Sequence, residues 1–346
     1  LAASAAPQAP AATQVATKTK PGVRGRHPEL FVDPGVIRTL DGGGSADLLV
    51  HFGELPDFKI FYSMPWLERG RAVYRTMEAL RATTQGPLIE ELDRRGVTYR
   101  SFWVGNIMEI DAADYTLFNE IVNFSDVRSV YPKPEFTLIQ PEDNTYPLIP
   151  FSGTRGSAPP DPNIAWVKAP EAWALGATGQ GVVIALNDSG PRHTHSLLAG
   201  SYRGNAGDTP DHNYNWFDPD SGSTSPVADS HGTLVLSLMV GSNEERITGM
   251  APDAQWMACR ACVGTGCPST GACLNWLLAP TDLTGANPDP DKRPHLINNS
   301  WGTCEQTYNA SHAPVISTLY ASGVIPLFSN GNASNCNYAG IRLRRG

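Results

Sequence analysis

The chain has 346 residues, a formal net charge of −8 and an apolar fraction of 41%. Because that length exceeds a typical single domain, we expect two folded units and connecting segments. Residues 160–340 contain 15 acidic and 7 basic residues, which argues against nucleic acid as a partner. No uninterrupted apolar run reaches about 18 residues, so the sequence predicts no membrane span.

Residues 1–45 are rich in Ala, Pro and Gly and end in Asp41-Gly-Gly-Gly44, a composition that predicts a leader and a flexible linker. The opening LAASAAPQAPAATQ has no Met and no basic start, but its small residues resemble the cleavage end of a secretory signal. We therefore expect a secreted, extracellular protein.

The sequence pattern of residues 46–132 predicts a small α+β domain. Apolar spacing predicts strands and helices in the order βαββαβ, at 47–52, 68–96, 97–103, 107–110, 114–123 and 127–131. The first helix is expected to be interrupted near Gly86-Pro87. This succession is that of the split βαβ, or ferredoxin-like, arrangement.

Residues 133–163 are rich in proline and show no periodicity, so we expect an accessible linker. From residue 164 onward, apolar strands alternate with helical stretches. The strands are expected at 182–186, 254–258, 296–299 and 324–328, and the helices at 169–175, 233–240 and 313–322. The alternation predicts an α/β fold with a doubly wound, mostly parallel sheet over residues 164–346.

Asp188 follows the apolar run Val182–Leu186, at the carboxyl end of a buried strand, where open α/β sheets bind ligands. The alternative is a turn aspartate that caps the next segment. His231-Gly-Thr233 opens an apolar helix 43 residues later, with Thr233 or Ser230 as the expected cap. A capping or surface histidine is the alternative there, but the pair fits a base with an orienting carboxylate.

All six cysteines lie in the second half of the chain, at positions 259, 262, 267, 273, 304 and 336. An even number of cysteines in an exported chain favours disulfides, and sequence alone leaves 15 connectivities open for six thiols. A zinc site at Cys259-x-x-Cys262 with Cys267 and Cys273 is the alternative, although its spacing fits none of the strong zinc patterns.

Six separated motifs between Gly179 and Asn337 resemble the subtilisin-like serine proteases (subtilases, peptidase S8), nearest the bacillopeptidase F-like secreted branch. They occur in family order: Val183-Ile-Ala-Leu-Asn-Asp188-Ser-Gly, His195, His231-Gly-Thr, Gly249-Met-Ala-Pro252, Asn298-Asn-Ser-Trp-Gly302, and Ala321-Ser-Gly-Val with Ser329-Asn-Gly-Asn332. Leu234, Leu236 and Ser237 stand where the family has His, a small residue and Gly.

The resemblance implies a serine endopeptidase that cleaves polypeptides without a required cofactor. It implies that Asp188 orients His231, the general base and then general acid, and that Asn332 is the oxyanion donor. It further implies that Ser300, Trp301 and Gly302 pair with an extended peptide substrate, and that Ser329, Asn330 and Gly331 line the primary specificity pocket.

The resemblance also implies a zymogen. Residues 46–132 are similar to the inhibitor I9-like propeptide of subtilases, which acts as an intramolecular inhibitor, and processing is expected within residues 133–163. The family nucleophile lies in Gly-Thr-Ser-x-Ala, but no Gly-Thr-Ser triplet occurs in the sequence. We therefore expect a C-terminally truncated fragment that is inactive as written. The alternative function is a non-catalytic binding or inhibitory protein that acts through the propeptide-like domain.

Four acids lie in an Asn- and Gly-rich loop, at Asp208, Asp211, Asp218 and Asp220. They are candidates for a structural calcium site, with a solvated loop as the alternative. No other metal site is expected.

Overall fold

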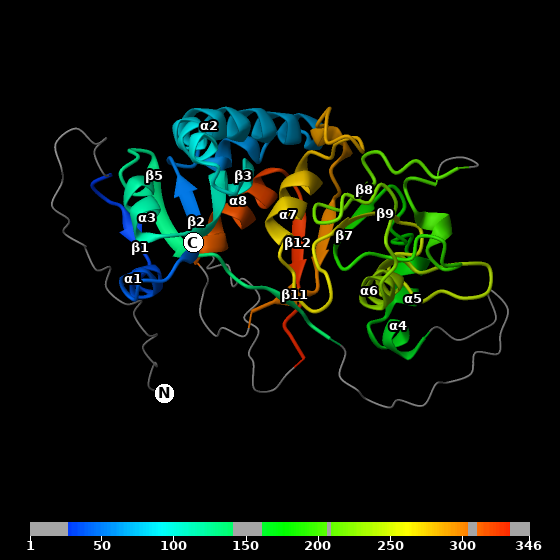
Figure 1. The fold of residues 1–346 in the computed structure, drawn as a ribbon. Helices are drawn as coiled ribbons and strands as arrows, with labels where there is room; N and C mark the ends of the chain where they lie inside the picture. Colours follow the sequence, from blue (N-terminus) through cyan, green and yellow to red (C-terminus); the bar gives the residue numbers. More distant parts are fainter. Residues whose placement is uncertain (1–26, 141–160, 206–208, 304–309, 333–346) are drawn as a thin grey trace, which may run out of the picture. The chain divides into compact units, whose positions relative to one another are not determined.

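The computed structural model describes residues 27–140, 161–205, 209–303 and 310–332, which group into two units (Figure 1). Unit 1 holds the described residues up to 56 together with 78–101 and 106–134. Unit 2 holds 57–77, 102–105 and the described residues from 135 onward. No helix in these ranges combines the length and apolarity needed to cross a membrane.

Unit 1 is built on a five-stranded sheet in the order β1-β5-β2-β4-β3. The central strand β2 pairs antiparallel with both β4 and β5. Apolar residues of α1, α2 and α3 pack on one face of this sheet, among them Val36, Leu88, Leu92 and Phe118. The elements are β1 (Phe31–Val32), α1 (Pro34–Asp41), β2 (Ala46–Phe52), α2 (Trp66–Arg95), β3 (Tyr99–Phe102), β4 (Ile107–Ala113), α3 (Tyr115–Ile121) and β5 (Val127–Pro132).

The expected βαββαβ succession is present as β2-α2-β3-β4-α3-β5, but two expectations were wrong. First, α2 runs through Pro87 without interruption, because Leu88 and Leu92 after the proline pack into the same core as the strands. Second, the linker expected through residue 45 contains β1 and α1. Asp33 caps α1, and β1 adds to the sheet beside β5.

Unit 2 contains the expected parallel sheet, with five strands in the order β12-β10-β7-β9-β8. Each neighbouring pair in this order is parallel. The strands are β7 (Val183–Asp188), β8 (Trp216–Phe217), β9 (Gln255–Arg260), β10 (Leu296–Asn299) and β12 (Ile325–Phe328). The helices are α4 (Pro162–Trp166), α5 (Ala169–Ala174), α6 (Ser230–Val240), α7 (Thr270–Leu278) and α8 (Ala313–Ala321).

Helices cover both faces of the parallel sheet. Leu236 and Val240 of α6 share a buried cluster with Ile184 and Leu186 of β7. Neighbouring strand residues point to opposite faces, and Cys259 of β9 is bonded to Cys273 of α7, so α7 lies on the face opposite α6. The short 3₁₀ helices are η1 (Phe58–Phe61), η2 (Val104–Asn106), η3 (Ala199–Ser201), η4 (Pro290–Lys292) and η5 (Ala310–His312).

The segment expected as a linker over 133–163 is partly structured. Its residues 137–138 form β6 (Thr137–Leu138), which pairs antiparallel with β11 (Trp301–Gly302). Phe136, Leu138 and Ile139 are buried, whereas Glu135, Thr137 and Gln140 are exposed, so the segment is accessible only in part where it is described. Residues 141–160 lie outside the described ranges.

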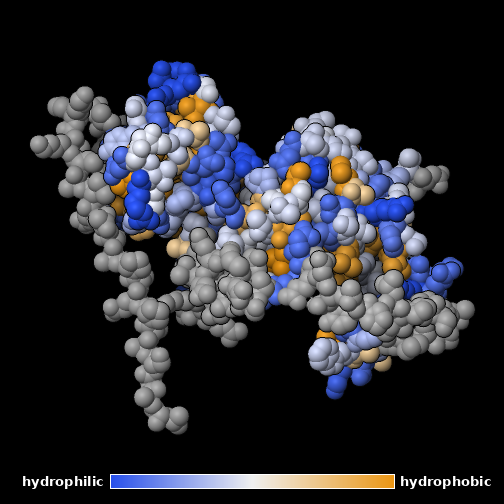
Figure 2. All heavy atoms as spheres, turned by 60° about the horizontal axis from the view of Figure 1, so that its bottom comes forward, coloured by the Kyte–Doolittle hydropathy of each residue, from blue (hydrophilic) through white to orange (hydrophobic). Residues whose placement is uncertain are grey.

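Two disulfides join four of the six cysteines, Cys259–Cys273 and Cys262–Cys267. These bonds use every thiol of the proposed zinc site, so the zinc alternative was wrong. Cys304 and Cys336 lie outside the described residues. On the face drawn in Figure 2, apolar side chains reach the surface in small groups separated by hydrophilic residues.

Candidate active site

Asp188 is the last residue of β7, at the carboxyl edge of the parallel sheet. Its side chain is fully buried. Asp188 Oδ1 accepts a hydrogen bond from the backbone N–H of Ser189 at 2.7 Å and lies 2.7 Å from Nδ1 of His231. The carboxylate thus sits where the strand ends and is fixed from two directions.

Helix α6 brings His231 to this edge of the sheet. Asp229 is the N-cap, and its carboxylate accepts from the backbone N–H of His231 at 2.9 Å. The expected cap at Thr233 or Ser230 was wrong, because Ser230 lies inside the helix and the Thr233 hydroxyl donates to the carbonyl of Asp229. The negative charge of Asp229 also interacts favourably with the positive end of the helix dipole.

The loop after β7 is bonded directly to the start of α6. The Ser189 hydroxyl donates to Asp229 Oδ1 at 2.7 Å and accepts from the backbone N–H of Gly232 at 3.1 Å. A Cβ on Gly232 would lie 2.7 Å from the carbonyl oxygen of Gly190. Glycine at position 232 therefore allows the close approach that sets the distance between Asp188 and His231.

Both ring nitrogens of His231 face acceptors. Nδ1 faces Asp188, and Nε2 lies 3.0 Å from the backbone carbonyl oxygen of Ile139. Burial works against the charged ring, but the hydrogen bond and negative charge of Asp188, with the Ile139 carbonyl, outweigh it and raise the pKa of His231. An imidazole with acceptors on both sides is held as a donor, so His231 is not available as a base in this arrangement.

Residues 136–140 lie along the site as an extended strand. On one side, the backbone N–H of Ile139 donates to the carbonyl of Ser300 at 3.1 Å, next to the β6–β11 pairing. On the other side, Leu138 N–H donates to the carbonyl of Thr265 at 2.9 Å. The phenyl ring of Phe136 packs 4.7 Å from the Trp301 ring, centroid to centroid. The site therefore holds a stretch of its own chain.

The remaining predicted site residues lie around this strand. Trp301 and Gly302 form β11, and the indole N–H of Trp301 donates to the carbonyl of Asn187 at 3.0 Å. Ser329 follows β12, and its backbone N–H donates to the carbonyl of Asn299. The Ser329 hydroxyl accepts a hydrogen bond from the Gly331 N–H at 3.2 Å. Asn330 lies between these two residues. Their predicted roles in substrate binding stay predictions.

Asn332, the predicted oxyanion donor, also contacts the bound strand. Its side-chain Nδ2 donates to the backbone carbonyl of Gln140 at 2.8 Å. Asn332 and His231 thus each bond to one of two consecutive peptide carbonyls, those of Gln140 and Ile139. A donor on a peptide carbonyl is the geometry that oxyanion stabilisation requires.

Comparison with known proteins decides the family. Residues 179–341 match the subtilase family, peptidase S8. The chain carries a subtilase domain. The chain is 31% identical to Bacillopeptidase F of Bacillus subtilis (strain 168) over 242 residues, which cover 67% of this chain and 16% of that protein.

Two further relatives are informative. The minor extracellular protease Vpr of Bacillus subtilis (strain 168) is 25% identical over 259 residues, covering 74% of this chain and 29% of Vpr. The crystal structure of fervidolysin from Fervidobacterium pennivorans, a keratinolytic enzyme related to subtilisin, matches with a TM-score of 0.52 and 15% identity. That match covers 91% of this chain and 43% of fervidolysin and concerns the fold alone. The chain spans less than a third of either curated relative.

Sequence reasoning missed two groups of residues in the subtilase domain. Asp229 and Ser189 connect β7 to α6, and the available signal was an Asp directly before Ser-His at a helix start. The hairpin Cys262–Cys267, which pairs with the bound strand, had only the spacing of its cysteines as a signal. The first group acts through side-chain hydrogen bonds and the second through backbone pairing, in both cases between distant segments, which sequence spacing alone does not reveal.

The acids proposed for calcium have separate partners where they are described. Asp218 forms an ion pair with Arg260 at 3.1 Å, and the low pKa of Asp218 reflects hydrogen bonds from Ser221 and this cation, which outweigh burial. Asp220 accepts from the Ser269 hydroxyl at 2.5 Å. Asp208 lies outside the described residues, and within them no three His, Cys, Asp or Glu side chains gather as a metal site. The calcium site stays a prediction.

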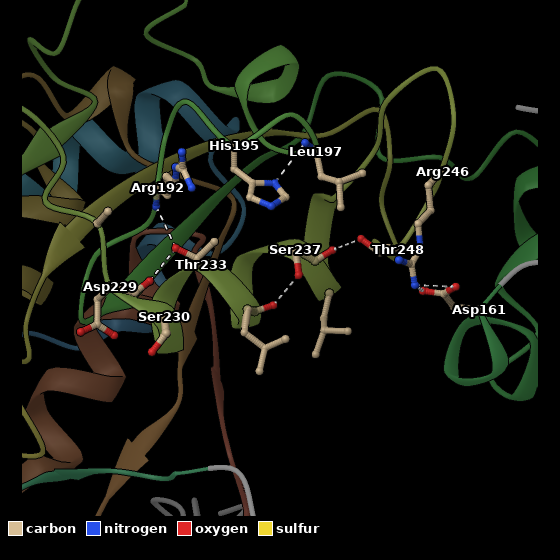
Figure 3. Close-up of a pocket in the computed structure, with 13 residues that line it drawn as sticks. Asp161, Arg192, His195, Leu197, Asp229, Ser230, Thr233, Ser237, Arg246 and Thr248 are labelled. Carbon is tan, nitrogen blue, oxygen red and sulfur yellow. Dashed lines mark hydrogen bonds and ion pairs between the residues drawn. The ribbon is translucent and has the colours of Figure 1, made fainter. Parts of the chain in front are cut away.

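A hollow lies on the outer face of α6 (Figure 3). Its volume is about 610 Å³, and its lining includes Leu234, Leu238 and the ion pair between Arg246 and Asp161. Figure 3 shows His195 and Arg192 on the loop above the helix, facing this hollow. His231 does not line this hollow, but Asp229, whose carboxylate accepts from the His231 N–H, does.

Proposed function

We propose that this chain is the precursor of a secreted serine endopeptidase in which Asp188 and His231 prepare a serine nucleophile. The observation that carries the proposal is the buried 2.7 Å contact between Asp188 Oδ1 and His231 Nδ1, inside a subtilase domain. The carboxylate fixes the ring tautomer, so that Nε2 can take the serine proton and then give it to the leaving amine. The extracellular destination rests on the name of Vpr and on the leader-like opening of the chain.

The substrates we propose are polypeptides bound as an extended strand. Residues 137–139 pair with Ser300, Trp301 and Gly302 through their backbones, which supports main-chain recognition with side-chain pockets adding specificity. We assign the stabilisation of the tetrahedral oxyanion to the Asn332 amide. Removing one such donor costs about 10²–10³ in kcat.

The proposal also concerns the serine nucleophile. The 346 residues contain no Gly-Thr-Ser triplet, and without a nucleophile no acyl-enzyme forms. A polypeptide of these 346 residues is therefore proposed to be without turnover. The protein made from the complete coding sequence, extended through a Gly-Thr-Ser-x-Ala segment, is proposed to be the peptidase.

The strand at residues 136–140 is proposed to be the end of the propeptide and to inhibit the site within the same molecule. It occupies the backbone positions proposed for substrate, and the Ile139 carbonyl accepts from His231 Nε2. Because the bonds from His231 and Asn332 fall on the carbonyls of Ile139 and Gln140, we propose that processing cuts after one of these two residues.

The decisive experiment uses the protein expressed from its complete coding sequence. We expect labelling of one serine by a fluorophosphonate probe, hydrolysis of casein, and a new amino terminus at residue 140 or 141 by Edman sequencing. The matched control is the His231→Gln protein, which is expected to stay unprocessed. If no reading frame past residue 346 encodes Gly-Thr-Ser-x-Ala, or if the complete protein takes no label, the peptidase proposal is wrong.

The alternative, a non-catalytic inhibitory protein, predicts a different result when the same experiments are done on the complete protein. An inhibitory protein would slow a related subtilase stoichiometrically and would take no fluorophosphonate label. Labelling with turnover rules this alternative out.

A further inference from the structure

The hairpin Cys262–Cys267, called the 262–267 hairpin below, has no assigned role in the subtilase domain. A disulfide joins its first and last residues. Between them Val263 N–H donates to the carbonyl of Gly266 at 2.9 Å, and Gly264 begins the turn with φ +60°. A two-residue turn with glycine first and a positive φ belongs to a tight β-hairpin, so the 262–267 hairpin is a short, closed strand pair.

The 262–267 hairpin pairs with the strand at residues 136–139 on the side opposite β11. Cys267 N–H donates to the carbonyl of Phe136 at 2.8 Å, and the Thr265 carbonyl accepts from Leu138 N–H at 2.9 Å. Thr137 forms an antiparallel bridge with Gly266. The bound strand is therefore the middle of three antiparallel strands.

The hairpin contacts only one part of the bound strand. Its bonds fall on Phe136 and Leu138, whereas Ile139, which faces His231, bonds to Ser300 on the other side. The residues that contact the hairpin are thus one and three positions before Ile139. A peptide that ends short of these positions cannot form the two bonds.

The disulfide compensates for weak packing at the hairpin tip. Val263 is 45% exposed, and Gly264 and Thr265 are also exposed. At the base, Cys262 and Cys267 are buried, and Ala261 N–H and Cys262 N–H donate to the Asp188 carbonyl at 2.8 and 3.2 Å. Exposed tips held only by local bonds open easily, whereas a covalent link at the base keeps the pairing atoms in place.

We propose that the Cys262–Cys267 disulfide is a positioning element for extended peptides. It holds the Thr265 carbonyl and the Cys267 N–H at the spacing that a peptide backbone needs, which reduces the ordering cost of binding. The inference rests on the proposed peptidase function, in which residues 136–139 occupy the place of substrate. It makes the enzyme selective for peptides long enough to fill the positions of Leu138 and Phe136.

The test compares a long and a short substrate on the complete protein. The long substrate is the 4-nitroanilide of Phe-Thr-Leu-Ile-Gln, and the short one is the 4-nitroanilide of Ile-Gln. In the double variant Cys262→Ser/Cys267→Ser we expect KM for the long substrate to rise about tenfold, the loss of two backbone hydrogen bonds. We expect kcat for the long substrate and kcat/KM for the short one to stay within about twofold.

A second variant addresses folding. A Cβ on Gly264 or on Gly285 meets nothing within 4 Å, and both glycines have positive φ, of +60° and +80°. Gly264→Val strains the hairpin turn, and Gly285→Val applies the same strain in another turn. Only Gly264→Val is expected to raise KM for the long substrate. An equal effect of both variants, or equal KM changes for long and short substrates, overturns the proposal.

Hydrogen exchange separates this inference from the peptidase function. In the 346-residue chain, the Leu138 amide is expected to exchange faster in Cys262→Ser/Cys267→Ser, with Cys259→Ser/Cys273→Ser as the matched disulfide control. If the complete protein has no peptidase activity but this exchange difference is found, the proposed function fails and the positioning role stands. If the two disulfide variants exchange alike at Leu138, the positioning role fails whatever the activity.

Discussion

The inner and outer faces of α6 differ in how deeply their side chains are buried. On the inner face, His231 is 5% exposed and Leu236 and Val240 are fully buried against β7 and β9. On the outer face, Leu234 and Leu238 are 47% and 42% exposed beside the hollow in Figure 3. One helix thus joins a tightly held site to a loosely covered surface.

The partners of the two faces explain this difference. His231 is held by Asp188 from β7 and by Ile139 from the bound strand, both distant in sequence. On the outer face, the Ser237 hydroxyl bonds to the carbonyl of Leu234 within the helix, and the bonds to the neighbouring loops, from the Arg192 N–H and the Thr248 hydroxyl, leave Leu234 and Leu238 exposed. Changes on the inner face should therefore affect catalysis and stability, while matched changes on the outer face should affect neither.

The largest expected effect separates the faces by activity. In the complete protein, His231→Gln should lower kcat/KM for a peptide substrate by about 10⁴-fold or more, because the base and its acid function are lost together. The outer-face control Leu234→Gln should stay within about twofold. A His231→Gln protein that keeps even a tenth of its activity would show that another group is the base.

The second effect separates the faces by stability and uses the same substitution twice. Leu236→Ala should lower the free energy of unfolding by about 2–5 kcal/mol, because it leaves a cavity between α6 and the sheet. Leu238→Ala, two residues along the same helix, should change it by about 0.5 kcal/mol or less. Urea unfolding of the 346-residue chain measures both, and equal losses would contradict the assignment of the faces.

The third effect is the pH dependence of the inner face. Because the pKa of His231 is raised in the folded chain, its contribution to stability is complete below its unfolded pKa of about 6.5 and is lost as pH rises through the higher folded value. The difference in unfolding free energy between the unmodified chain and His231→Gln should therefore shrink between pH 6 and pH 9. A difference that stays constant over this range would mean that the bonds to Asp188 and Ile139 do not hold the charged ring.

Much of this site was predictable from the sequence. Five apolar residues before Asp188, and His-Gly-Thr at the start of an apolar helix, place both groups at one edge of a parallel sheet without knowledge of the tertiary structure. The two faces of α6 also explain why leucine can stand at positions 234 and 236, where the family has His and a small residue. Leu236 fills the core beside Ile184, while Leu234 faces outward.

The bound strand could not be predicted. Phe136 to Ile139 stand among prolines, and they are extended because β11 and the 262–267 hairpin offer backbone partners from more than 100 residues away. The prediction of the N-cap of α6 was wrong for a related reason. Asp229, Ser230 and Thr233 are all good caps by residue type, and the bond from Ser189 to Asp229 is visible only in three dimensions.

The smallest expected effect concerns the ion pair between Arg246 and Asp161, which lines the hollow beside the outer face of α6. Arg246 Nη2 lies 2.8 Å from Asp161 Oδ2, with side chains 41% and 22% exposed. Arg246→Gln should lower the free energy of unfolding by only about 0.2–1 kcal/mol, since solvent screens such pairs, and the loss should shrink further in high salt. A loss above about 2 kcal/mol in urea unfolding would show that the outer face is held as firmly as the inner one, and the contrast between the two faces would then fail.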